Sequence, residues 1–220
     1  MLKDWSKLEK ILLFGSITTI SLVSIIFKSD LLHTICSILI IISTLLVAKG
    51  KNLGNIVGII ATIIYSIVSY KNRFYGEVII CLVLIIPFYT AGIISWAKHK
   101  NEETNTVKID KISKKEWVLI LIVGIITFIA IYYLLKYFNT NELLVSTISV
   151  INSLFATYLQ VRRSKYCFCF YILNDFTLLI LWGIPVILGN LLVLPMIFEP
   201  IVNLINDLYG FQSWNKLENK

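Results

Sequence analysis

The chain has 220 residues, of which 57% are hydrophobic and 15% are charged, and its formal net charge is +7. This apolar content exceeds what one globular core can bury, and a spanning helix takes roughly 17–25 residues, so the chain holds at most about ten spans and no sizeable soluble domain. The basic residues lie in short stretches between apolar runs and do not gather on one face, which excludes a nucleic-acid partner.

Eight apolar runs separated by charged or turn-forming stretches predict eight transmembrane helices. In chain order they are Ile11–Phe27, Leu31–Ala48, Leu53–Ser69, Gly76–Trp96, Trp117–Tyr137, Leu143–Val161, Phe168–Leu188 and Leu191–Tyr209. The ten-residue alternation typical of membrane barrels is absent, so these spans are expected to be α-helices. The first run resembles a secretory signal peptide, but no small-residue cleavage pattern follows it, and we interpret it as a retained span.

The basic residues test this count, because eight spans leave nine flanking segments that alternate between the two faces of the membrane. Sixteen of the 20 Lys and Arg residues, from Lys3 to Lys220, fall in segments on the side of the N-terminus. The opposite side holds Lys28, Lys71, Arg73 and Lys136. The positive-inside rule therefore places both termini in the cytoplasm. The compact chain without a targeting extension is expected in the plasma or inner membrane of a bacterium.

A polar, doubly charged segment from Lys98 to Glu116 divides the chain near its middle and predicts a linker. On either side of it, Gly-Ile-Ile-Ser-Trp-Ala-Lys ending at Lys98 matches Gly-Phe-Gln-Ser-Trp-Asn-Lys ending at Lys216. Both copies lie at the cytoplasmic end of a span, which favours an internal duplication. The alternative is that Trp and Lys serve here as ordinary interfacial anchors.

The duplication predicts two three-helix units that both begin outside and end inside, and that therefore run parallel, joined by an inverting linker helix. The predicted segments are an extra helix at 1–30, a first unit at 31–97, a loop and linker helix at 98–142, a second unit at 143–215 and a tail at 216–220. A solute site is expected near the midplane of the membrane, between the two units.

Acidic and amide side chains form a stripe along the eighth span, at spacings of three and four residues. An acid at the centre of a spanning helix costs about 3 kcal/mol on insertion scales, and no Lys or Arg lies in any helix interior to neutralise it. Similar polar stripes run along one face of the seventh span and one face of the sixth span. The candidate substrate-binding residues are Asn174, Asp175, Tyr171, Trp182, Glu199, Asn203, Asn206, Asp207, Tyr209 and Asn152. For isolated Ser and Thr residues in the spans, hydrogen bonding between helices is the favoured role.

The chemistry of these stripes limits the cargo. Unpaired carboxyl groups favour a cation or a neutral solute with many hydrogen bonds, and Tyr171, Trp182 and Tyr209 could stack on a flat ring. Phosphorylated or carboxylate cargo is disfavoured. The membrane itself and a small molecule are the expected partners, and a homo-oligomer stays open.

Cysteine and histidine spacing predicts neither a metal site nor a disulfide framework. The residues concerned are Cys36, Cys81, Cys167, Cys169, His33 and His99. No Walker loop, HExxH or GxSxG pattern occurs in the chain, so we expect no cofactor, no ATP-driven pumping and no hydrolysis. An alternative from another class is a membrane enzyme that uses Glu199, Asp207 and Asp175 as acid and base groups on a lipid-linked substrate.

Three features together resemble the nicotinamide riboside transporter family, PnuC. They are the run from Asn206 to Trp214, the Tyr75-Gly76-Glu77 sequence and Asn55, and the resemblance extends over Leu31 to Lys216. It implies a fold related to the SWEET sugar transporters, with two parallel three-helix units and a linker helix. It also implies facilitated diffusion of a vitamin-like nucleoside, which is retained in the cell after phosphorylation by a separate kinase.

The family's Trp-x-x-Trp-x-x-x-Asn pattern stands here as Cys167-x-x-Phe170-x-x-x-Asn174, so only the asparagine is kept. The resemblance therefore implies the class of cargo more than its identity, and thiamine, riboflavin and deoxynucleosides are alternatives to nicotinamide riboside. For a flat cationic cargo we expect Asn174 and Asn203 to bind the ribose or amide. Glu199 and Asp175 would favour the charged ring, and Tyr171 and Trp182 would stack on it. Coupling to protons stays open.

Overall fold

Helices long enough to cross a membrane account for most of the chain. The computed structural model describes residues 5–219, and eight helices in this range are long and apolar enough to span a bilayer. The predicted eight-helix membrane fold is therefore confirmed. Lys3 and Lys220, which were counted with the cytoplasmic basic residues, lie outside the described range, as do the first residues of the predicted 1–30 segment.

The spans are α1 (Lys7–Ile26), α2 (Leu31–Ala48), α3 (Leu53–Lys71), α4 (Tyr75–Ile80) continued by a π-helical turn (Cys81–Ile85) and α5 (Ile86–Lys98), α6 (Lys114–Tyr137), α7 (Leu143–Val161), α8 (Cys167–Ile187), and a 3₁₀ turn (Leu191–Val193) continued by α9 (Pro195–Glu218). A short hairpin of β1 (Lys100–Asn101) and β2 (Thr106–Val107) follows α5. The sequence had predicted no secondary structure in that part of the linker.

Polar side chains at the membrane surface start several helices. Ser6 and Glu9 cap α1 reciprocally, because each side chain accepts a hydrogen bond from the other's backbone N–H. The carboxylate of Asp30 accepts from the backbone N–H of Leu32 at 2.8 Å and caps α2. This hydrogen bond holds the pKa of Asp30 below its usual value. These caps satisfy N–H groups that the first turn of a helix cannot pair internally.

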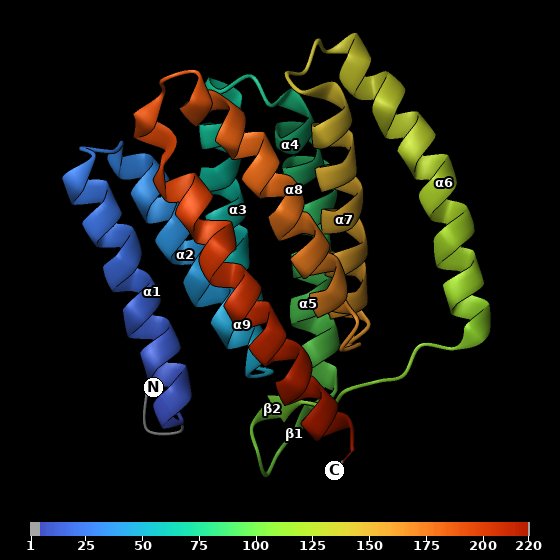
Figure 1. Ribbon diagram of the computed structural model, residues 1–220. Helices are drawn as coiled ribbons and strands as arrows, with labels where there is room; N and C mark the ends of the chain where they lie inside the picture. Colours follow the sequence, from blue (N-terminus) through green and yellow to red (C-terminus); the bar gives the residue numbers. More distant parts are fainter. Residues whose placement is uncertain (1–4, 220) are drawn as a thin grey trace.

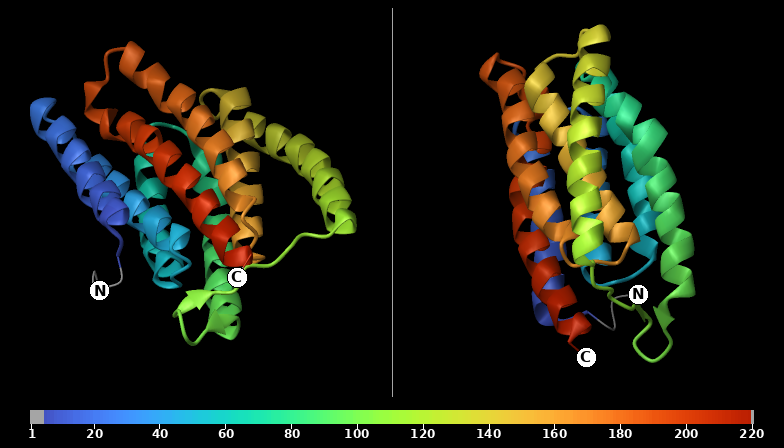
Figure 2. Two further views of the ribbon diagram at one scale, coloured as in Figure 1. Left: turned by 60° about the horizontal axis from the view of Figure 1, so that its bottom comes forward. Right: turned by 90° about the vertical axis from the view of Figure 1, so that its right-hand side faces the viewer.

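The helices form two groups that meet along the centre of the bundle (Figure 1). The first group is α2, α3 and α4–α5, and the second is α7, α8 and α9. The helices α2 and α9 pack together, as do α5 and α7, so the groups meet along two seams. Helix α1 covers α2 and α9 on one side, whereas α6 stands at the opposite edge beside α7 (Figures 1 and 2). Helix α1 begins and α9 ends at the same end of the bundle, as an even number of spans requires.

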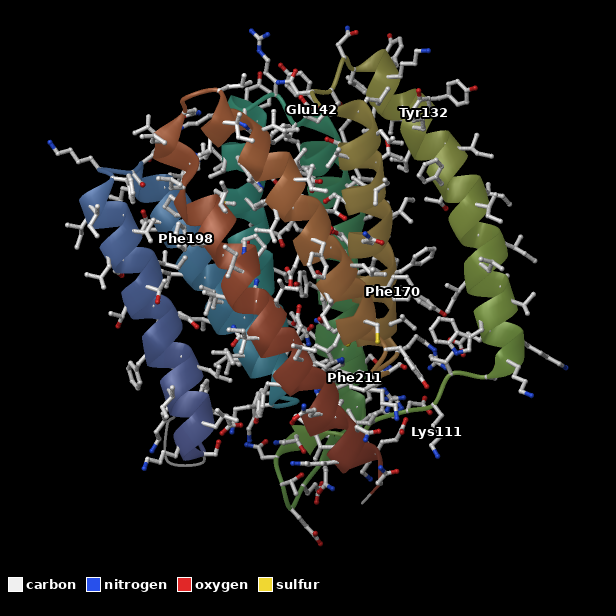
Figure 3. The ribbon with its side chains drawn as sticks, viewed as in Figure 1. Lys111, Tyr132, Glu142, Phe170, Phe198 and Phe211 are labelled. Atoms are coloured by element: carbon white, nitrogen blue, oxygen red, sulfur yellow. The ribbon has the colours of Figure 1, made fainter. Side chains whose placement is uncertain are left out.

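The surface of the bundle is apolar along its length and charged at its ends. Side chains of α6 project from the bundle in Figure 3, and exposed members include Val118, Leu121, Ile125 and Ile129. Such a surface is suited to lipid and not to water.

The turns that follow α2 and α7 have the same conformation. Gly50 and Arg163 both adopt a positive φ, of 68° and 60°. Each donates its backbone N–H to the residue three positions earlier, Gly50 to Val47 at 2.7 Å and Arg163 to Gln160 at 2.9 Å. Gly50 adopts this conformation at no steric cost, whereas Arg163 is held there although it carries a side chain. The same turn also follows α1, α3, α6 and α8, at Lys28, Arg73, Asn139 and Gly189, so it is the general way in which helices of this bundle end.

The two tryptophans of the repeated sequence make reciprocal contacts between the groups. The indole of Trp96 donates to the carbonyl of Gln160 at 2.9 Å, and that of Trp214 donates to the carbonyl of Val47 at 3.0 Å. Each tryptophan thus ends one group and bonds to the end of the first helix in the other. The two rings also lie against each other, with centroids 5.5 Å apart. We name this pair of rings the inner tryptophan pair.

The fourth span is irregular where Pro87 follows the π-helical turn. Proline has no backbone N–H to donate to the preceding turn, and π-helical turns are frequent at functional sites. Cys81 and Ile85 from this turn face the central cavity described next.

Candidate functional site

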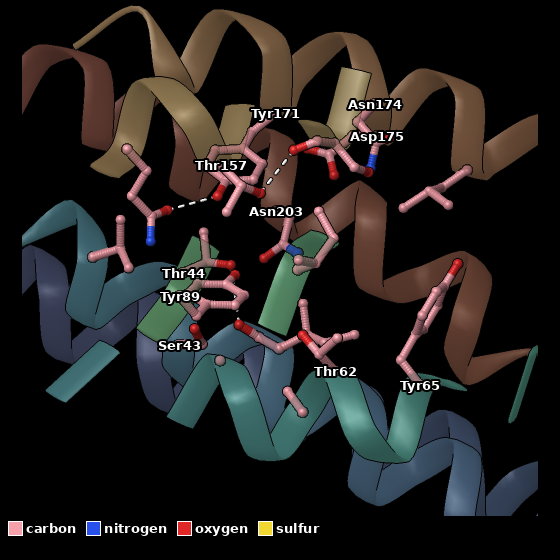
Figure 4. A pocket seen from close by; sticks show the side chains of 18 of the residues that line it. Ser43, Thr44, Thr62, Tyr65, Tyr89, Thr157, Tyr171, Asn174, Asp175 and Asn203 are labelled. Atoms are coloured by element: carbon pink, nitrogen blue, oxygen red, sulfur yellow. Dashed lines mark hydrogen bonds between the residues drawn. The ribbon is translucent and has the colours of Figure 1, made fainter. Parts of the chain in front are cut away.

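A cavity of about 140 Å³ lies between the two groups of helices. In Figure 4, Ser43 and Thr44 of α2 and Thr62 and Tyr65 of α3 project into it from one side, and Tyr171 of α8 faces them from the other. Every one of the six helical spans in the two groups contributes lining residues. The cavity is therefore a property of the interface and not of either group alone.

Four carboxyl groups line this cavity, at Glu77, Asp175, Glu199 and Asp207. Each residue is at most 4% exposed. None of the described residues that line the cavity is a lysine, arginine or histidine. Burying a carboxylate without a partner is costly, so such a cavity suits a positively charged occupant or carboxyl groups that stay protonated.

Two of the acids belong to a polar row on α9. The side-chain amide of Asn203 donates to the carboxylate of Glu199, one turn away. Asn206 lies one turn further along and donates weakly to Asn203 at 3.5 Å. Asp207 in turn interacts electrostatically with Asp175 of α8, so the acids of the second group lie in contact with polar or acidic neighbours.

Asn174 is fixed by a hydrogen bond from the neighbouring helix. The hydroxyl of Ser149 on α7 donates to the amide oxygen of Asn174 at 3.1 Å. With its oxygen engaged, the amide nitrogen is the atom that Asn174 offers to a solute as a donor. Figure 4 shows Asn174 and the adjacent Asp175 beside the cavity.

Hydrogen bonds cross the inner end of the cavity from one group to the other. The hydroxyl of Tyr171 donates to the amide oxygen of Gln160 at 2.6 Å, and the amide nitrogen of Gln160 donates to Asn55 at 2.7 Å. This row joins α8, α7 and α3. Tyr89 of α5 lies close to Gly58 of α3, where an added Cβ would come within 2.7 Å of the tyrosine ring.

Buried aromatic side chains close both ends of the cavity. Trp182 is fully buried at the outer end, where its ring packs edge-on with Phe74, Tyr65 and His33 at centroid distances of 5.0, 6.1 and 6.4 Å. The inner tryptophan pair lies at the opposite end, and Phe168 packs on Trp214 at 5.1 Å. We name the first of these layers, formed by Trp182, Phe74, Tyr65 and His33, the outer aromatic layer.

Most of the residues predicted from the sequence meet at this cavity. Those that line it are Tyr171, Asn174, Asp175, Glu199, Asn203 and Asp207. Four others do not line it, and their positions are as follows: Asn152 donates to Thr177 at 3.2 Å, Asn206 lies beneath Asn203, Tyr209 donates to Glu9 at 2.6 Å, and Trp182 belongs to the outer aromatic layer.

Glu77 lines the cavity and, among the described residues, is its one acid outside the set of predicted site residues. It entered the sequence analysis only as part of the family resemblance. The signal that could have identified it is the one that identified Glu199, an acid within an apolar span and without a basic residue to pair with. Tyr89 and Gln160 were also outside the predicted set.

Comparison with known proteins agrees with this architecture. A family model described as "Nicotinamide mononucleotide transporter" matches residues 30–216. The chain belongs to this family. The resemblance to PnuC proteins is thereby confirmed. A curated relative named "Nicotinamide riboside transporter PnuC", from Neisseria mucosa (strain ATCC 25996 / DSM 4631 / NCTC 10774 / M26), is 23% identical over 97% of this chain and 82% of its own length.

The fold has a match among solved structures. "Crystal structure of the Vitamin B3 transporter PnuC" superposes with a TM-score of 0.87 at 22% identity, and the match covers 98% of this chain and 94% of that one. At this identity the likeness concerns the fold. Both relatives are named as transporters, and this chain has the multi-pass fold of a membrane protein.

The family pattern at the start of α8 has Cys167 and Phe170 at the two positions where the family carries tryptophan. Both side chains pack within the protein. Cys167 is fully buried among the residues around the inner tryptophan pair, and Phe170 packs against Phe155 with centroids 5.3 Å apart. Neither lines the cavity, whereas Tyr171 and Asn174 do. The aromatic side chains that α8 presents to the cavity here are therefore Phe168 and Tyr171, and neither is an indole.

Proposed function

We propose that this protein carries nicotinamide riboside into a bacterial cell by facilitated diffusion, and that phosphorylation by a separate kinase retains the cargo inside. The observation that carries the proposal is the acidic cavity between the two helix groups, closed at both ends by aromatic side chains. A carrier needs a site that either side of the membrane can reach in turn, and a site at the interface of two movable units provides it.

The charge of the cavity favours the riboside over its phosphorylated form, the mononucleotide. A phosphate is held in proteins by arginine, lysine or several backbone N–H groups. The described lining contains four acids and no basic side chain. Nicotinamide riboside carries a positive charge on its pyridinium ring and none on its ribose, so it suits this lining.

The lining residues suggest a pose. Asn174 and Asn203 can bind the ribose hydroxyls or the ring carboxamide, and Tyr171 can stack on the ring. Glu199 and Asp175 make the surroundings acidic. Trp182 supports the outer aromatic layer above the site and does not line the cavity.

Transport requires the two groups to move. A cavity of about 140 Å³ is smaller than the roughly 300–1,000 Å³ typical of ligand pockets, so the groups have to separate to admit a nucleoside. Opening the outer aromatic layer while the inner tryptophan pair stays closed would admit cargo from outside, and the reverse would release it into the cytoplasm. The distribution of basic residues favours the cytoplasmic side for the inner tryptophan pair.

Counterflow into liposomes tests the proposal. Purified protein is reconstituted with unlabelled nicotinamide riboside inside, and entry of the radiolabelled compound is followed with thiamine, riboflavin and deoxynucleosides as competitors. Accumulation that is blocked by nicotinamide riboside alone supports both carrier and cargo. Strong inhibition by another competitor would replace the cargo, and absence of exchange for every labelled candidate would contradict the carrier.

The alternative of a membrane enzyme finds less support in the cavity. Acid and base groups acting on a lipid-linked substrate need to lie where lipid headgroups can reach them. Asp175, Glu199 and Asp207 lie between two aromatic layers and are at most 4% exposed. Hydrolysis or transfer of a labelled polyprenyl phosphate by the purified protein would favour the enzyme.

A further inference from the structure

The four acids of the cavity differ in their surroundings. Glu199 accepts a hydrogen bond from Asn203, and Asp175 and Asp207 interact with each other. Glu77 projects from the other helix group, at the start of α4, and is 4% exposed. Its oxygen Oε1 is buried and has no hydrogen-bond partner among the described residues.

Among residues 5–219, the side chains that interact with Glu77 are polar or weakly polar, and none of them is an acid or a base of opposite charge. Ser149 of α7 lies within hydrogen-bonding reach of the carboxyl group, and Tyr65 of α3 and Cys81 of the π-helical turn lie close by. Ser149 also donates to Asn174. The carboxyl group of Glu77 and the amide of Asn174 are thus the two sides of one polar patch, which contains a member from each helix group.

Glu77 has no cationic partner among the described residues, and a positively charged group in the cavity could supply one. Asp175 and Asp207 also leave one buried oxygen each, Oδ2 and Oδ1, without a partner among the described residues. These two carboxyl groups lie close enough to interact, and adjacent carboxyl groups resist full ionisation because like charges repel. Glu199 already has an amide partner. Glu77 has no acidic neighbour that competes for a cation and no donor on Oε1, so a cation beside it would form a one-to-one charge pair in a water-poor site.

We propose that Glu77 is the residue that selects a positively charged cargo ring, by pairing with it across the cavity from Asn174. This inference rests on the proposed function and deepens it, because it assigns recognition of the charge to the first helix group and recognition of hydrogen-bonding groups to the second. A cargo that bridges the two would also couple its binding to the distance between the groups.

The test compares two compounds that differ in the charge of the ring. Nicotinamide riboside is a cation, and its dihydro form has a neutral ring with the same carboxamide and ribose. The Glu77→Gln variant keeps the shape of the side chain and removes its charge. In counterflow assays it should lower the ratio of cation exchange to neutral exchange by about tenfold or more, because one buried opposite charge typically contributes at least this factor.

Two further variants control this result. Glu142→Gln removes an exposed acid at the same end of the bundle and should leave the ratio unchanged. Glu77→Asp shortens the side chain but keeps its charge, and should preserve the preference for the cation. An unchanged ratio in Glu77→Gln, or equal loss of both compounds in Glu77→Gln and Glu77→Asp, would overturn the inference by showing a structural role.

The outcome remains decisive if Glu77→Gln fails to fold. The Glu77→Met variant then removes the charge with an apolar side chain of similar length that suits the buried position, and it should lower the ratio of cation exchange to neutral exchange as Glu77→Gln does, whereas an unchanged ratio would overturn the inference. The proposed function fails separately, if wild-type protein exchanges thiamine and not nicotinamide riboside. Charge selection by Glu77 is then upheld or rejected by the effect of Glu77→Gln on thiamine relative to a neutral deoxynucleoside.

Discussion

Asn174 and Asn152 form a matched pair of asparagines, one beside the cavity and the other away from it. Each is joined to a hydroxyl of a neighbouring helix, Ser149 for Asn174 and Thr177 for Asn152. Replacing either with leucine removes one such bond and should cost about 1–3 kcal/mol of stability. Uptake should fall below about a tenth of the wild-type rate in Asn174→Leu and stay near the wild-type rate in Asn152→Leu.

Uptake in cells and thermal unfolding in detergent together check this prediction. Similar unfolding temperatures for the two variants make the comparison of uptake meaningful. Equal uptake by both variants would remove Asn174 from the site, and a loss of uptake in Asn152→Leu alone would place the pathway beside Asn152 and Thr177.

At this scale the sequence predicted residue type better than residue position. Acids and amides at helical spacing identified one face of α8 and α9, and six residues on those faces line the cavity. Helical spacing does not tell how deep each residue lies or which neighbour it meets. Tyr209 was predicted to stack on a flat cargo ring, whereas its hydroxyl bonds to Glu9 of α1, a helix outside both groups.

At the scale of elements, two glycines predict opposite effects of the same substitution. A Cβ on Gly58 would lie 2.7 Å from Tyr89 and 3.0 Å from the Ser43 hydroxyl, whereas nothing lies within 4 Å of a Cβ on Gly15. Gly58→Ala should lower the unfolding temperature and weaken transport, because overpacking typically costs about 1–3 kcal/mol. Gly15→Ala should raise the unfolding temperature slightly, since alanine favours a helix by up to about 1 kcal/mol.

Thermal unfolding with counterflow on the same preparations checks both variants. An unfolding temperature of Gly58→Ala equal to that of Gly15→Ala would show that α3 and α5 can separate at no cost. It would contradict the close contact that shapes this wall of the cavity.

The inner tryptophan pair predicts where the cavity opens to the cytoplasm. Cys81 lines the cavity, so its labelling by a membrane-impermeant maleimide from the cytoplasmic side reports opening. In a chain whose other three cysteines are replaced by alanine, Trp214→Phe should speed labelling roughly 2- to 10-fold, because it loses the hydrogen bond to Val47 and keeps an aromatic ring.

The matched control for this variant is Trp117→Phe. Trp117 packs on Tyr166 with centroids 5.4 Å apart and does not line the cavity. Its replacement should leave the labelling rate of Cys81 unchanged. Equal acceleration in both variants, or none in Trp214→Phe, would contradict the role of the inner tryptophan pair as the cytoplasmic closure.

The sequence predicted elements well where one physical requirement dominates. Each long apolar run has to satisfy its backbone hydrogen bonds inside the membrane, and this requirement yields the eight spans. The same requirement does not apply to backbone groups outside the membrane, so the hairpin at Lys100–Asn101 and Thr106–Val107 was not predicted. The extension of α9 to Glu218 was also unexpected, because its last turns are polar, yet Trp214 within them is fully buried.

At the scale of the whole molecule, the two halves of the chain meet in a way that a single sequence indicates only in part. The repeated Gly-x-x-Ser-Trp-x-Lys sequence indicated a duplication, and the reciprocal bonds of Trp96 and Trp214 show what these tryptophans do. The cavity depends on contacts between residues more than a hundred positions apart, such as Gln160 with Asn55. Spacing along one helix carries no information about such contacts, which is why the contribution of the first group was underestimated.

A cation that moves without a coupling ion responds to membrane potential in a defined way. Moving one elementary charge across 100 mV involves about 2.3 kcal/mol, so accumulation should change about tenfold for each 60 mV or so. A proton-coupled carrier would respond to a pH gradient as well. The response to membrane potential and to a pH gradient therefore tells whether the acids that line the cavity bind a cationic cargo alone or also carry protons.

The most direct measurement is uptake of radiolabelled nicotinamide riboside into liposomes that hold the purified protein, with an inside-negative potential set by potassium and valinomycin. Accumulation should rise about tenfold per 60 mV or so, should be unaffected by a proton ionophore and should be lost in Asn174→Leu. Uptake that ignores the potential, or that collapses with the proton ionophore while the potential is held, would contradict uncoupled transport of a cation through the acidic cavity.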